Sequence, residues 1–117
     1  MFENLTPHIV NIHTGGVVLT LPPTGKSLRV AANPVAVGEH DGVTVFDIEY
    51  GELEMVDNAT KEVTTGLPPV VDGTLYIVAG QCSDKIRAAG RKDFVSPGDL
   101  IRDEKGQPCG CKGVKRI

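Results

Sequence analysis

The chain has 117 residues, of which 40% are hydrophobic, and a net charge of −3. This length predicts one domain, residues 1–117, that buries a core without needing disulfides or metals. Three Phe, two Tyr and no Trp argue against a surface that stacks nucleic-acid bases. No apolar run reaches the roughly 20 residues of a membrane helix, and residues 1–4 lack the features of a signal peptide, so we expect a cytoplasmic protein.

Short runs of Val, Ile and Thr, broken by Gly, Pro, Asn and Asp, predict a β-rich fold. In the first half of the chain, the expected strands are 8–13, 17–21, 28–31, 35–37 and 43–50. We expect Asn33-Pro34 to interrupt the chain, Asp41-Gly42 to form a tight hairpin turn and Gly51 to end the strongest strand. The apolar parity of that strand shifts near Val45, which indicates a β-bulge or burial on both faces.

The second half alternates polar loops with a few ordered segments. Residues 57–65 and 93–98 are expected as loops, and the expected strands are 74–79, which is apolar on both parities, 99–103 and 109–117. One helix is predicted at 84–89, capped by Ser83 and ended by Gly90. The fold class is therefore mainly β: a small barrel or sandwich of about seven or eight short strands with one short helix.

The charges divide along the chain. Residues 39–62 hold eight acids and one cation, whereas residues 85–117 hold nine cations and four acids. A chain divided in this way either pairs its two halves or presents a positive face to an anionic partner. The acids alternate with apolar residues, which is typical of the solvated face of a strand pair.

The cations around the expected helix are the main candidates for ligand binding. They are Lys85, Arg87, Arg91, Lys92 and Arg102. Arginine forks bind phosphate oxygens through paired hydrogen bonds, and the loop that contains Ser96 would let a ligand approach the backbone. A plain solvated basic face is the alternative interpretation.

The segment Asn4-Leu5-Thr6-Pro7-His8 is dense in small polar groups. Asn4 and Thr6 either fix the entry of the first strand through hydrogen bonds to nearby backbone, or line the rim of a ligand pocket together with His8. Both interpretations stay open at this point.

Neither a metal site nor a catalytic site is predicted. The odd number of cysteines gives no disulfide framework, and Cys109 and Cys111 lack the usual zinc spacing. His8 and His13, five apart on a strand, point to opposite faces and cannot share an ion. The chain has no nucleophile elbow and no phosphate loop, so no cofactor and no enzymatic activity are expected.

Several short sequence motifs occur in order along nearly the whole chain. They are NLTPH at 4–8, LPPTG at 21–25, YG at 50–51, GLP at 66–68, GTLYIV at 73–78, SPG at 96–98 and IRD at 101–103. Together they resemble an uncharacterised family of small proteins carried by bacteriophages, prophages and some bacteria. The resemblance implies a phage setting and no mechanism.

We therefore predict a small phage-type binding protein that holds a small anionic, nucleotide-like ligand, such as a signal of host defence. The first alternative is a structural or assembly module, in which the acidic strand of one copy meets the basic segment of another in a homo-oligomer. The second alternative is a small phosphoester hydrolase that uses His8. No membrane partner is expected, and nucleic acid is an unlikely partner by composition.

Overall fold

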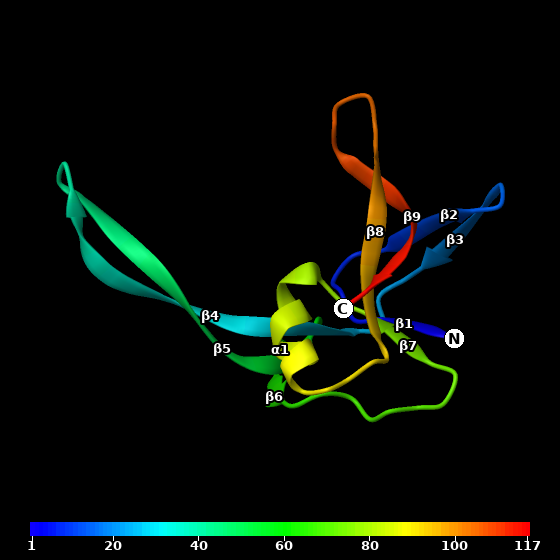
Figure 1. The fold of residues 1–117 in the computed structure, drawn as a ribbon, viewed down its shortest axis with the longest axis horizontal. Helices are drawn as coiled ribbons and strands as arrows, with labels where there is room; N and C mark the ends of the chain where they lie inside the picture. Colours follow the sequence, from blue (N-terminus) through cyan, green and yellow to red (C-terminus); the bar gives the residue numbers. More distant parts are fainter.

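The chain forms two β-sheets and one short helix in the computed structural model, which describes all 117 residues (Figure 1). The strands are β1 (Phe2–Asn4), β2 (Val10–Thr14), β3 (Val17–Leu21), β4 (Lys26–His40), β5 (Val43–Asp57), β6 (Val63–Thr65), β7 (Leu75–Ile77), β8 (Phe94–Arg102) and β9 (Pro108–Arg116). A 3-10 turn, η1 (Gly80–Cys82), leads into the helix α1 (Ser83–Ala88). The expected mainly β fold with one short helix is confirmed.

The first sheet is a curled half-barrel with the strand order β1-β7-β8-β9-β2-β3. Its β7 lies between β1 and β8, and both neighbours run parallel to it, so the prediction of a central strand at 74–79 is confirmed. The β8–β9 and β2–β3 pairs are antiparallel hairpins. A single residue pair, Ile12 with Cys111, joins β2 to β9, and the two strands diverge beyond it.

The second sheet has the order β4-β5-β6, and β4 and β5 have 15 residues each. Asn33-Pro34 does not interrupt β4, contrary to expectation. Because β4 is an edge strand, the missing N–H of Pro34 deprives no neighbouring strand of a donor. Residues 63–65 were expected within a loop, and they instead form β6 along the inner end of β5.

Two bulges bend the β4–β5 hairpin. Gly51 does not end β5 as expected, because it forms a bulge with Glu52 opposite Ala31. The second bulge is Val37, between the pairs Ala36–Phe46 and Gly38–Val45. A bulge therefore lies opposite Val45 as expected, but its extra residue is on the partner strand and leaves the alternation of β5 unchanged. Burial on both faces, the other explanation of the parity shift, is wrong because residues 43–50 are all exposed. At the tip, Asp41 and Gly42 both have positive φ, which confirms the tight hairpin turn.

The core lies under the helix and between the strands of the half-barrel. One buried cluster packs α1 against β4, β7 and β8, and a second joins β2, β7, β8 and β9. Tyr76 and Phe94 stack in the first cluster with ring centroids 5.2 Å apart. The 3-10 turn that precedes Ser83 already has helical geometry, so the helix begins there without the side-chain cap predicted for Ser83.

Residues 94–98 of the segment 93–98, which was expected as a loop, are instead the first part of β8. Phe94, Val95 and Ser96 are all buried there, so tertiary packing overrides the turn-forming composition of Ser96-Pro97-Gly98. Pro97 is tolerated because β7 pairs only with Phe94 and Val95 and ends before it. The one α-helix has six residues, and no helix here is long and apolar enough to cross a membrane.

The outer part of the β4–β5 hairpin stands away from the rest of the molecule (Figure 1). We call residues 32–50 the arm and the remainder the body. Every residue of the arm is exposed, and the molecule reaches 53 Å along its longest axis. The arm therefore contributes no side chain to the core.

Candidate functional site

The predicted ligand-binding arginines do not converge on one site. Arg91 donates from Nε and Nη2 to the two carboxylate oxygens of Asp93, at 2.8 and 2.7 Å, and from Nη1 to the carbonyl of Pro68 at 2.8 Å. Its guanidinium also lies 5.0 Å from the centroid of the Phe94 ring. The hydrogen bond from Arg91 holds the pKa of Asp93 below its ordinary value. Arg91 thus joins the loop at Pro68 to Asp93, which directly precedes β8. All three of its guanidinium nitrogens already donate hydrogen bonds, so few donors remain for a ligand.

The other cations of the predicted site are exposed and separate. Arg87 pairs with Asp84 at 3.1 Å on the outer face of α1. Arg102 lies at the far end of β8, where its Nη1 donates to the carbonyl of Gly106 at 2.9 Å. Lys92 is exposed and makes no ion pair. The structure therefore gives these three side chains no common cavity.

Ser96 and Asn4 are both buried, each with 1% of its surface exposed, but their polar groups differ. The Ser96 hydroxyl has no hydrogen-bond partner. The Asn4 amide donates to the carbonyls of His8 and Leu21 at 2.8 and 2.9 Å, and its Oδ1 accepts from the backbone N–H and the hydroxyl of Thr6. Asn4 and Thr6 thus make the local hydrogen bonds that the structural interpretation expects, and these bonds shape the turn that leads into β2.

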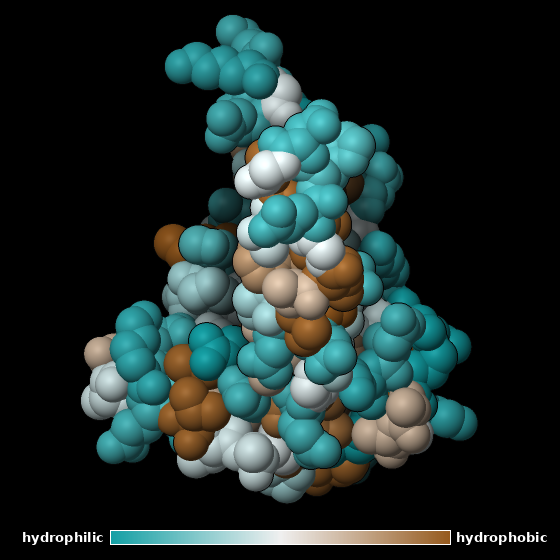
Figure 2. Space-filling view, turned by 90° about the vertical axis from the view of Figure 1, so that its left-hand side faces the viewer, coloured by the Kyte–Doolittle hydropathy of each residue, from teal (hydrophilic) through white to brown (hydrophobic).

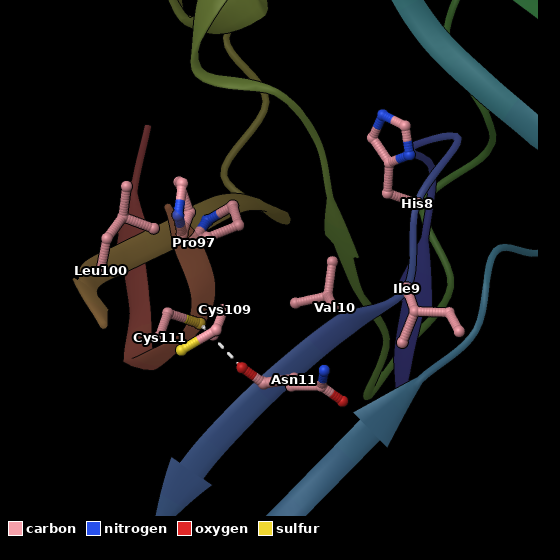
Figure 3. Close-up of a pocket in the computed structure, with 10 residues that line it drawn as sticks. His8, Ile9, Val10, Asn11, Pro97, Leu100, Cys109 and Cys111 are labelled. Atoms are coloured by element: carbon pink, nitrogen blue, oxygen red, sulfur yellow. Dashed lines mark hydrogen bonds between the residues drawn. The ribbon is translucent and has the colours of Figure 1, made fainter. Parts of the chain in front are cut away.

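His8 is exposed and is one of the residues that line a groove between β2 and β9, with its imidazole directed away from the two cysteines (Figure 3). We call this hollow, about 400 Å³ in volume, the β2–β9 groove. It exists because the two strands diverge beyond their single residue pair. Its apolar walls come from Ile9, Val10, Pro97, Leu100 and Pro108.

Two of the three cysteines also line this groove. Cys109 is exposed and Cys111 is buried, and both side chains lie at the β9 side of the groove in Figure 3. Cys82 belongs to the other buried cluster, where burial raises the pKa of its thiol. No group of three or more His, Cys, Asp or Glu side chains is placed to hold a metal ion.

The arm is a functional feature that the sequence analysis did not single out. The cross-strand pairs Ala36–Phe46, Pro34–Ile48 and Ala32–Tyr50 all place their side chains on one face, because alternate residues of a strand share a face. We call this the apolar face of the arm. Its three largest side chains, Phe46, Ile48 and Tyr50, are 54%, 48% and 63% exposed. Asp47 and Glu49 occupy the opposite face.

Figure 2 looks onto the side of the molecule from which the arm projects, and it shows hydrophobic side chains gathered between hydrophilic ones. The arm holds four acids and no Lys or Arg, while the body holds all twelve cations and eleven acids. The arm is therefore net −4 and the body net +1. The charge division of the sequence becomes a division between two regions in space.

Comparison with known proteins does not explain the arm or the groove. No protein-family model, curated protein or solved structure matches the chain.

Proposed function

We propose that the protein is a non-enzymatic assembly module that associates with further copies of itself through the arm. The observation that carries this proposal is the apolar face of the arm, on a two-stranded ribbon in which every residue is exposed. An isolated two-stranded hairpin is marginally stable at best in water. A partner that covers the apolar face would supply the burial that the ribbon lacks.

The charge distribution supports a second copy as this partner. The arm is net −4 and the body net +1, so an arm is attracted to the body of another molecule. Two arms packed against each other would instead bring like charges together. Exposed strand edges and apolar patches of this kind are usually shielded in proteins that remain single.

Light scattering coupled to size-exclusion chromatography tests the proposal. We expect a mass that is a multiple of the 12.4 kDa chain and that decreases between about 0.1 M and about 1 M salt, where the Debye length falls from about 10 Å to about 3 Å. A monomer at both salt concentrations would contradict self-association.

A matched pair of variants assigns the association to one face of the arm. Phe46→Ser on the apolar face should shift the mass toward the monomer. Val35→Ser removes an exposed apolar side chain from the opposite face and should leave the mass unchanged. Equal effects of the two substitutions would mean that the apolar face is not the contact.

A second candidate function is binding of a small anionic, nucleotide-like ligand beside α1. It is favoured by a hollow of about 330 Å³ whose lining includes Tyr50, Gly80 and Lys85. An aromatic ring stacks on a base and a cation pairs with a phosphate. Calorimetry with a panel of mononucleotides and cyclic nucleotides tests it, and the absence of heat with all of them would end the idea.

A further inference from the structure

We infer that the apolar face of the arm binds in the β2–β9 groove of a second copy. This inference rests on the self-association proposed above and adds the surface that receives the arm. It also requires that the arm and the groove belong to different molecules. Figure 1 supports this, because the arm projects from one side of the body while β2 and β3 lie on the opposite side.

The groove matches the arm in its chemistry. Half of the groove lining is hydrophobic, and two of its wall residues are largely exposed, Ile9 at 59% and Leu100 at 48%. A groove of about 400 Å³ has room for large side chains such as those of Phe46 and Ile48. Filling it would bury apolar surface on both molecules, which is the main favourable contribution to association.

The walls of the groove favour insertion of side chains over addition of a strand. Pro97 and Pro108 line it, and proline has no backbone N–H to donate to an added strand. Recognition by strand addition depends on such main-chain hydrogen bonds. The arm already pairs its own two strands and presents only side chains on its apolar face, so it fits a groove of this type.

The hairpin that forms one wall of the groove has a net charge opposite in sign to that of the arm. The β8–β9 hairpin that forms one wall contains five cations and three acids between residues 94 and 117. Arg102 is paired in register with the groove residue Pro108, and Lys112, which follows the groove residue Cys111, is 65% exposed and lies 3.9 Å from Asp99. Glu39, paired with Thr44, lies on the same face of the arm as Phe46. An arm seated in the groove therefore brings an acid toward a net basic hairpin.

The native Cys109 provides a direct test, since it is exposed in the groove while Cys82 and Cys111 are 1% exposed. We place a second thiol on the apolar face with Ile48→Cys and treat the full-length protein with a short bismaleimide. We expect a covalent dimer on a denaturing gel, and its loss when Cys109→Ser is added. Wild-type protein reports any background linkage between two Cys109 thiols.

Two controls make the assignment specific. Glu49→Cys places the thiol on the opposite face of the arm and should lose most of the dimer band. An equal mixture of wild-type protein with Ile48→Cys/Cys109→Ser should regain the band, because the two thiols then lie on different chains. Cross-linking that persists in Ile48→Cys/Cys109→Ser alone would overturn the assignment to the groove.

Substitutions on the groove side supply an independent measurement. Leu100→Asp places an acid among the apolar walls and should convert the oligomer to monomer. Val17→Asp alters a residue on β3 that is 64% exposed and does not line the groove, so the oligomer should persist. An oligomer that survives Leu100→Asp and shows no linkage through Cys109 would refute the groove and leave arm-mediated association standing. A wild-type monomer would refute both.

Discussion

Phe94 in the body and Phe46 in the arm are the same residue type in opposite situations. Phe94 is 2% exposed and stacks on Tyr76 beneath Arg91, whereas Phe46 is 54% exposed on a ribbon with no covering layer. The body uses its apolar residues to fold. The arm uses none of its own for that purpose, so their presence is better explained by a partner than by the monomer.

The sharpest test of this comparison substitutes both rings. Phe94→Ala should lower the free energy of unfolding by about 3–5 kcal/mol, because it removes a buried ring and leaves a cavity. Phe46→Ala should change it by no more than about 0.5 kcal/mol in the monomer. Urea unfolding at low protein concentration measures both, since the oligomer then contributes least. Similar losses in the two variants would show that the arm belongs to the folding unit.

Buried polar groups within the body offer a second, smaller test. Asn4→Ala should cost about 2–3 kcal/mol, because it leaves the carbonyls and N–H groups that Asn4 satisfies without partners. Ser96→Ala removes a hydroxyl that has no partner and should change stability by less than about 0.5 kcal/mol. Thermal and urea unfolding compare the two. A large loss with Ser96→Ala would mean that its hydroxyl makes a hydrogen bond after all.

The sequence predicted the parts of the fold that depend on local chemistry. Asp41-Gly42 specified its turn through the need for positive φ. A bulge does lie opposite Val45, but its extra residue, Val37, is on the partner strand and does not produce the shift of parity within β5. The continuity of β4 through Asn33-Pro34 was not predictable locally. It depends on β4 being an edge strand, which is a property of the sheet and not of the dipeptide.

The candidate site was less predictable for the same reason. A cluster of cations in the sequence does not say which of them is already paired, and Arg91 is bound to Asp93 and Pro68. The sequence signal for the Arg91–Asp93 pair was the position of Asp93, two residues after Arg91. The arm had a clearer signal in the sequence. A tight turn lies between two runs rich in Val, Phe and Ile, and this pattern indicates a two-stranded hairpin with exposed apolar side chains.

Acid should lower the free energy of unfolding of the body, because it protonates the Asp93 carboxylate that pairs with Arg91. The hydrogen bond from Arg91 lowers the pKa of Asp93 in the folded state, so the pair contributes stability above the ordinary Asp pKa of about 3.9, and this stability is lost as the pH falls through the lowered value. Asp57 acts in the same direction, because backbone N–H groups of Thr60 and Ala59 lower its pKa. Unfolding free energies measured between neutral pH and about pH 2.5 should decrease below about pH 4.

Asp93→Asn measures how much of the stability lost at low pH comes from the Arg91–Asp93 ion pair. The variant should be less stable than wild type at neutral pH, and the difference should shrink as the pH falls, because wild type also loses the charge of Asp93. A difference that stays constant across the pH range would show that Asp93 stabilises the body by packing alone.

The smallest expected effect on stability comes from removing the arm. Ala32 and Tyr50 are opposite each other in register, so an Asn-Gly turn can join them, with a geometry suited to a two-residue hairpin. The change keeps the bulge at Gly51 and all the buried residues. We expect an unfolding free energy within about 0.5 kcal/mol of that of the wild-type monomer, together with a monomeric mass in light scattering.

These two readouts separate the roles of the arm. Loss of self-association with unchanged stability would mean that the arm serves a partner and that the body folds without it. A body that unfolds when the arm is removed would instead make the hairpin part of the folding unit, despite the exposure of residues 32–50. Retained self-association would show that the contact lies in the body, and it would contradict the proposal that the apolar face of the arm binds a second copy.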